Sequence, residues 1–163
     1  MTESVPEGSH SPGNKVLKLR VTLAADRDAV DPVVQSVMQV VRDVQVVAGK
    51  EDSVELALTE ALANAVVHGA KGDVTKVVEC DVIYDEPQGL VIIVRDPGEG
   101  FDPNGVPNPL QGENVYSNHG RGIYLINQLM DEVSFERNGA EIRMRKGAGT
   151  SEAPPLAATG TGD

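Results

Sequence analysis

The sequence predicts an α+β fold, a two-layer α/β sandwich in which helices cover one face of a mostly antiparallel sheet. Its predicted elements follow the order strand, helix, helix, two strands, helix, two strands. Each pair of adjacent strands is joined by a short turn-rich segment, which is typical of antiparallel hairpins. The chain has 163 residues, enough for one compact domain with its own core, so a single domain is expected.

The first half of the chain contains one predicted strand and two predicted helices. Apolar and polar residues alternate over 15–25, which indicates a half-buried strand. Apolar residues at helical spacing then predict two helices, each closed by a glycine. The first runs from Asp31-Pro32, or from nearer Asp26, to Gly49, and the second covers 52–70 with Gly69 as its stop.

The second half contains four predicted strands and one predicted helix. Asn138-Gly139 is a strong signal for a tight hairpin turn between the last two strands. The long segment from Asp96 to Asn118 has no sustained apolar period, so we expect a functional loop there, a lid at about 102–118. The predicted strands are 74–84, 89–95, 132–136 and 140–146, and the predicted helix is 119–133.

Composition and charge exclude several classes of protein. The net charge of −11 argues against nucleic acid or an anionic membrane as the main partner, because both require a basic patch. No apolar run approaches the ~20 residues of a membrane span, so a cytoplasmic protein is expected. The single Cys80 cannot form an internal disulfide and is expected to lie within the sheet. Both tails, 1–14 and 147–163, are polar and are expected to be disordered around a domain at 15–146.

The first candidate site follows the strand 89–95. Asp96 ends the strand and is followed by Gly98 and Gly100. Glycines at this spacing allow a positive φ or a close approach of the backbone to a bound group. The turn is therefore predicted to be a binding site.

The second candidate site lies on the second predicted helix. Glu60, Asn64 and His68 are spaced by four residues, so successive side chains differ by only about 40° around the helix and share one face. An isolated Glu or Asn on a helix is usually solvated. Three in line, beside the small residues Ala57 and Ala61, instead favour a polar site.

The third candidate site is at the start of the last predicted helix. Gly120 and Gly122 flank Arg121, and a helix N-terminus with free backbone N–H groups and an adjacent guanidinium favours an anion such as phosphate. A tight junction between loop and helix is the alternative. The sequence contains no P-loop pattern and no complete dinucleotide-binding fingerprint.

These segments together resemble the boxes of the ATP-binding fold of gyrase, histidine kinases and MutL, the histidine-kinase-like or Bergerat fold. Within that superfamily the chain resembles the short anti-sigma-factor serine-protein kinases of bacterial partner switching. The resemblance covers about residues 15–146. It is carried by 60-EALANAVVH-68, 96-DPGEGFDP-103 and 120-GRGIYLI-126, which resemble its Glu-x-x-x-Asn-Ala-x-x-His, Asp-x-Gly-x-Gly-Phe-Asp-Pro and second glycine boxes.

The resemblance implies a role for each candidate residue. Asp96 is implied to accept a hydrogen bond from the adenine amine, and a buried carboxylate would reject the carbonyl of guanine. Asn64 is implied as the Mg²⁺ ligand, and Glu60 as the base or orienting carboxylate for the attacking hydroxyl. His68 is implied to brace the helix end or the lid. The remaining implied nucleotide contacts are Gly98, Gly100, Phe101, His119, Gly120, Arg121, Gly122 and Ile123.

The resemblance also implies partners and leaves alternatives open. In one interpretation the protein is a homodimeric serine kinase that binds a sigma factor, and so regulates transcription, and phosphorylates a STAS-type antagonist. In another, ATP is bound but not used, and the protein is a nucleotide-dependent binding module. The presence of Glu60 favours the kinase, because a pure binding module does not need that carboxylate. A detached catalytic domain of a histidine kinase is disfavoured, since no helix carries a phosphoacceptor His.

Overall fold

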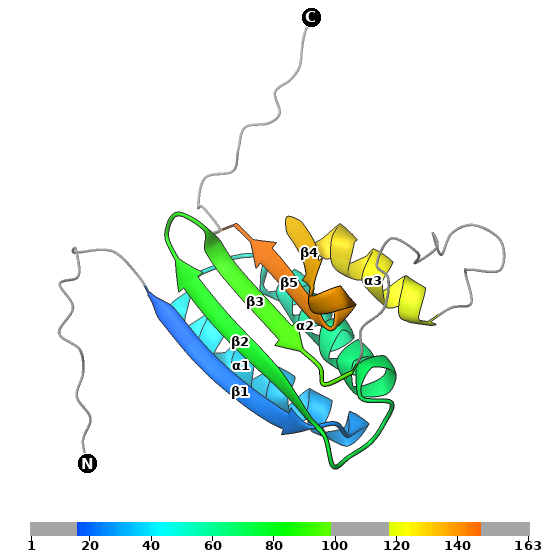
Figure 1. The fold of residues 1–163 in the computed structure, drawn as a ribbon. Helices are drawn as coiled ribbons and strands as arrows, with labels where there is room; N and C mark the ends of the chain where they lie inside the picture. Colours follow the sequence, from blue (N-terminus) through cyan, green and yellow to red (C-terminus); the bar gives the residue numbers. More distant parts are fainter. Residues whose placement is uncertain (1–15, 99–117, 148–163) are drawn as a thin grey trace, which may run out of the picture.

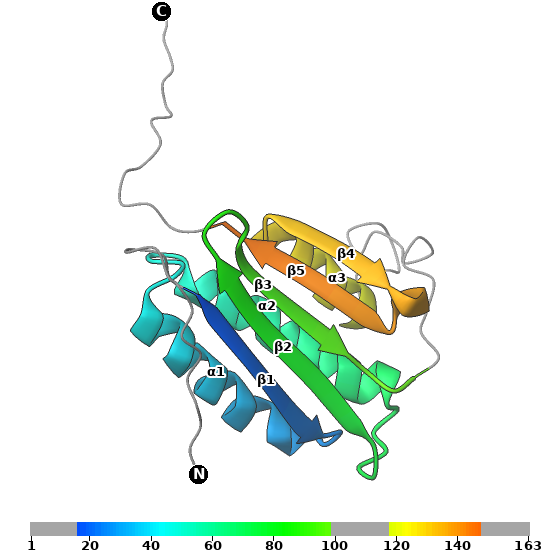
Figure 2. The same cartoon turned by 60° about the vertical axis from the view of Figure 1, so that its left-hand side comes forward.

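The computed structural model describes residues 16–98 and 118–147. The predicted tails, apart from Gly147, and nearly all of the predicted lid lie outside these residues. Within them, a single sheet has three helices on one face and none on the other (Figures 1 and 2). The predicted two-layer α+β architecture is confirmed.

The sheet contains five strands in the order β1-β2-β3-β5-β4, and every neighbouring pair is antiparallel. Both predicted hairpins, β2–β3 and β4–β5, are present. The prediction for β2 was three residues too long at its start, because Val74 to Lys76 form a turn instead. The strands are β1 (Leu17–Ala24), β2 (Val77–Asp85), β3 (Gly89–Arg95), β4 (Glu132–Glu136) and β5 (Glu141–Lys146).

The helices are α1 (Val30–Val44), α2 (Glu51–Asn64) and α3 (Asn118–Leu129). The predicted start at Asp31-Pro32 is correct to within one residue, and the earlier alternative at Asp26 is instead the cap of a separate 3₁₀ turn, Arg27–Ala29, that precedes α1. The predicted stop at Gly49 is wrong for the helix proper. Gln45 ends α1 by adopting the left-handed conformation, with φ 59°, and its N–H bonds to the carbonyls of Val41 and Arg42.

The core lies between the sheet and the helices. Alternation along each strand places one set of side chains against the helices, and in β2 this set includes Cys80, which is fully buried as predicted. The largest fully buried side chains are aliphatic or Met, which agrees with an aromatic content of only 3%. They are Met38, Leu58, Leu62, Leu90, Ile92, Ile126, Met144, Val34, Val37, Val41, Val46 and Val47.

The face of the sheet opposite the helices carries a network of ion pairs. Arg20 holds Asp81 with two bonds, at 2.6 and 2.9 Å, and Arg95 bonds Asp81 at 2.8 Å. Val91 and Ile93 on this face are only 4% exposed although no helix covers them, so the long side chains of neighbouring strands shield them. No helix in the described part of the chain is long and apolar enough to cross a membrane.

Candidate functional site

Two residues of the predicted polar line on α2 meet the backbone of α3. A Cβ atom placed on Gly122 would lie 3.0 Å from Glu60 Oε1 and 3.1 Å from Asn64 Nδ2. Glu60 and Asn64 are half-buried and Gly122 is buried. The prediction that Glu60 and Asn64 share a face is therefore confirmed, and the helix spacing is what aligns them.

The helix changes character directly after Asn64. Residues Ala65–Gly69 form a π-helical turn, in which the N–H of Ala70 bonds the carbonyl of Ala65 at 2.8 Å. Such turns are rare and are frequent at functional sites. The chain reverses only afterwards, at Lys71 and Gly72, whose φ values are 56° and 72°. The prediction that Gly69 ends the helix is confirmed for the helical segment as a whole, although the α-helix itself ends at Asn64 and the last turn is π-helical.

His68 lies within this π-helical turn. The step of about 100° per residue that predicts its direction applies to an α-helix, so it does not hold after Asn64. Its side chain is exposed at the surface, yet partial burial lowers the pKa of the imidazole and so favours the neutral form at pH 7.

Asp96 follows β3 and is held at the end of the π-helical turn. Its backbone N–H bonds the carbonyl of Ala140 at 2.9 Å, and its Oδ1 accepts from the N–H of Gly98 at 2.7 Å. Gly98 does not need a positive φ, which corrects one of the two predicted reasons for this glycine. Close approach to a bound group stays a prediction, and the structure supplies a different reason: a Cβ on Gly98 would collide with the carbonyl oxygen of Gly69.

The environment of Asp96 suits a carboxylate that accepts a hydrogen bond from a ligand. Burial raises the pKa of its carboxyl, while the N–H of Gly98 and the positive charge of Arg137 oppose that rise. Oδ2 has no hydrogen bond within the described part of the chain. A half-buried carboxylate oxygen without a donor is costly unless a ligand supplies one, and the exocyclic amine of adenine is a suitable donor.

Arg137 belongs to the β4–β5 turn, where three successive residues have positive φ. These values are 54° for Arg137, 58° for Asn138 and 90° for Gly139. Asn and Gly adopt this region readily, but Arg does so at a cost. The sequence signal for the turn was therefore correct, and the proximity of the turn to Asp96 was not predictable from it.

Several predicted site residues cannot be placed. Gly100 and Phe101 lie outside the described residues, as do the side chains of His119 and Arg121. The backbone of α3 starts at Asn118, so Gly120 and Gly122 fall within its first turns. Ile123 is buried, with 8% exposure.

The described residues contain no group of three or more His, Cys, Asp or Glu side chains that could hold a metal ion. Asn64, with Glu60 one turn away, is consistent with a Mg²⁺ ion that takes one or two protein ligands and completes its shell with phosphate oxygens and water. Glu60 and Asn64 lie on α2, and Asp96 lies against Gly69 at the end of the following π-helical turn, so the two candidate groups occupy different positions along one helical segment.

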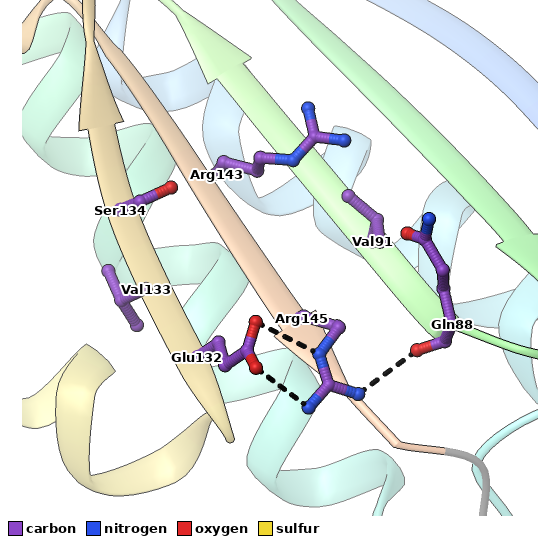
Figure 3. Close-up of a pocket in the computed structure, with 7 residues that line it drawn as sticks. All are labelled: Gln88, Val91, Glu132, Val133, Ser134, Arg143 and Arg145. Atoms are coloured by element: carbon purple, nitrogen blue, oxygen red, sulfur yellow. Dashed lines mark hydrogen bonds and ion pairs between the residues drawn. The ribbon is translucent and has the colours of Figure 1, made fainter.

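A shallow pocket of about 390 Å³ lies on the opposite face of the sheet (Figure 3). Arg145 is held there by Glu132, at 3.2 Å, and by the carbonyl of Gln88, at 3.0 Å. Arg143 and Ser134 line the same pocket above Val91. Because α2 lies behind the sheet, this pocket contains none of Glu60, Asn64 and Asp96, and it is not the candidate nucleotide site.

Comparison with known proteins agrees with this geometry. The family described as histidine kinase-like ATPase domain matches residues 23–146. The chain belongs to this family. The histidine kinase-like ATPase domain thus includes all three helices, strands β2 to β5, and the candidate residues Glu60, Asn64 and Asp96.

Curated relatives of this histidine kinase-like ATPase are named serine-protein kinase RsbW. The protein from Staphylococcus epidermidis is 34% identical over 105 residues, which are 59% of this chain and 64% of the relative. The protein from Bacillus licheniformis is 34% identical over 102 residues, 58% and 63% of the two chains. That from Bacillus cereus (strain AH187) is 29% identical over 102 residues, 58% and 62%. The matched region spans under two thirds of the length of these relatives.

Proposed function

We propose that the protein is an ATP-dependent serine-protein kinase that also acts as an anti-sigma factor. In this proposal it binds a sigma factor, phosphorylates a STAS-type anti-anti-sigma protein, and works as a homodimer in the cytoplasm. The observation that carries the proposal is the convergence of Glu60 and Asn64 on Gly122. A site that only bound a nucleotide would not need the carboxylate.

In the proposed reaction each residue has one task. Asp96 accepts the hydrogen bond of the adenine amine and so selects ATP over GTP. Asn64 holds the Mg²⁺ ion, which would neutralise phosphate charge when bound. Glu60 orients the attacking serine hydroxyl and takes its proton as the new O–P bond forms and the bond to the ADP oxygen breaks. Arg121 balances charge on the β- and γ-phosphates.

The relatives' name supports the kinase activity, and the family supports ATP use. The sigma factor, the STAS-type substrate and the homodimer rest on the resemblance of the three sequence boxes. The competing proposal is a nucleotide-dependent binding module of the same fold, which would switch partners between ADP and ATP without transferring phosphate.

The test is transfer of labelled phosphate from ATP to a candidate STAS-type protein, measured beside nucleotide affinity. Glu60→Gln should keep nucleotide binding and lower transfer by roughly 10²- to 10⁴-fold, the usual effect of removing a general base. Asn64→Ala should weaken both binding and transfer. Asp52→Asn is a matched control on the same helix, because Asp52 is exposed and far from Gly122.

Two results would contradict the proposal. If the wild-type protein switches partners between ADP and ATP but never transfers phosphate, the binding module is correct. If Glu60→Gln transfers phosphate at the wild-type rate, Glu60 is not the base.

A further inference from the structure

Gly69 occupies a position that no side chain could share with Asp96. An ideal Cβ on Gly69 would collide with the carboxyl carbon and Oδ2 of Asp96 and lie 2.6 Å from its Cβ. The φ of Gly69 is outside the left-handed region, so its backbone conformation does not require glycine. The close approach of the Asp96 carboxylate is therefore the reason that glycine is needed here.

We infer that Gly69 is a positioning residue that aims Asp96 Oδ2 at the 6-amino group of a purine, and so determines nucleotide specificity. The inference rests on the proposed ATP-binding function. Gly69 itself makes no proposed contact with adenine. It ends the π-helical turn that directly follows α2, the helix that carries Glu60 and Asn64.

Among the described residues, two hydrogen bonds and one steric contact restrain Asp96, and Gly69 supplies the steric contact. The carbonyl of Ala140 fixes the backbone of Asp96, and the N–H of Gly98 engages Oδ1. These two bonds still allow the carboxyl to tilt. The end of the π-helical turn limits that tilt, because Gly69 Cα lies against the carboxyl and its carbonyl oxygen lies against Gly98.

A methyl group at position 69 must displace the carboxyl group of Asp96 or push the π-helical turn away from the end of β3. Alanine is favoured over glycine in a helix by about 1 kcal/mol, so the helical segment itself should tolerate the change. The displaced carboxyl should lose the hydrogen bond to the amine. Hydrogen bonds to charged groups contribute roughly 10- to 150-fold in affinity.

The experiment compares Mg-ATP with the triphosphate of purine riboside, which lacks the 6-amino group, by calorimetry on the full chain. We expect the wild type to prefer ATP by roughly 10- to 100-fold and Gly69→Ala to lose most of that preference. A purely structural defect would weaken both nucleotides equally. Gly72→Ala is the control, because Gly72 lies three residues further along the chain, has a φ of +72° and has no atom within 4 Å of its Cβ position. The substitution therefore strains the backbone without contacting Asp96.

A double-mutant cycle keeps the inference testable if Gly69→Ala folds poorly. Asp96→Gly removes the Cβ, the carboxyl carbon and Oδ2, the three atoms with which the new methyl collides, so Gly69→Ala/Asp96→Gly should show a smaller loss of unfolding temperature than the sum of the two single substitutions. Additive effects of the two substitutions on unfolding would overturn the inference. So would an unchanged ATP preference in Gly69→Ala. Wild-type protein that binds neither nucleotide would instead contradict the proposed function.

Discussion

Gly122→Ala perturbs the candidate catalytic pair without changing either member. The new Cβ would lie 3.0 Å from Glu60 Oε1 and 3.1 Å from Asn64 Nδ2, whereas ordinary contacts begin at 3.4 Å. The two side chains must therefore move by about 0.4 and 0.3 Å, the differences between these distances. A misplacement of 1 Å can cost about 10²-fold in rate. If the logarithm of the rate falls in proportion to the displacement, shifts of about 0.3 to 0.4 Å lower the rate of phosphotransfer by about 4- to 6-fold.

The same substitution should leave the fold almost unchanged. Alanine in place of glycine favours a helix by about 1 kcal/mol, which offsets part of the steric cost in α3. We expect the free energy of unfolding to stay within about 1 kcal/mol of the wild-type value.

The assay is single-turnover phosphotransfer with saturating Mg-ATP, combined with urea denaturation. Gln128→Ala is the control, because Gln128 is exposed on the same helix. An unchanged transfer rate would refute the reasoning, since it would mean that Glu60 and Asn64 either do not move or do not position the reacting groups. A loss of several kcal/mol in stability would show instead that α2 and α3 cannot adjust.

Two further predictions concern stability and the buried thiol. Bonds from Arg20 and then Arg95 lower the pKa of Asp81 to about 2, so Asp81 stabilises the fold above the unfolded pKa of about 4 and this contribution is lost as pH falls towards 2. Because the Arg20 side chain is 61% exposed, solvent screening reduces the effect. Asp81→Asn should cost about 1 kcal/mol in urea denaturation at pH 7 and about half as much at pH 3, which lies midway between the folded and unfolded pKa values. An equal cost at both pH values would contradict this. Burial raises the pKa of Cys80 to about 12, so a thiol reagent should modify it only after opening of the fold, and Mg-ATP at ten times its dissociation constant should slow modification about 11-fold. Rapid modification of the native protein would show that β2 is accessible.

The architecture was predictable because its signals are local. Alternation along β1, the Asn138-Gly139 turn and the apolar spacing of α1 are each determined within a few residues, and each is present in the structure. The first helix was predicted five residues too long because Gln45 took the left-handed position that glycine usually occupies. Glutamine carries no such signal in a sequence.

The candidate site was predictable only in part. The four-residue spacing predicted that Glu60 and Asn64 share a face, but not that Gly122 lies against them, because that contact joins residues about sixty positions apart. Ala57 and Ala61 were expected only as small residues beside the polar line, and the sequence did not show that both belong to the core. Gly69, which directly follows His68, was interpreted from the sequence only as the end of the helix. Its contact with Asp96 was therefore not predicted.

In the proposed function, one helical segment serves both ends of a nucleotide, and the π-helical turn at its end gives a structural reason why it can. A regular α-helix through residues 65–69 would bond Ala70 to Val66, whereas the structure bonds it to Ala65, which widens this turn. Val54, Leu58 and Leu62 fix the preceding α-helical part to the core, so Glu60 and Asn64 keep the α-helical alignment that the phosphate end requires. The added backbone in the turn then shifts Gly69 relative to that alignment, and Gly69 meets Asp96 at the adenine end. In a uniform α-helix the positions of Glu60 and Asn64 would also fix the position of Gly69. The π-helical turn lets Gly69 take a position of its own against Asp96.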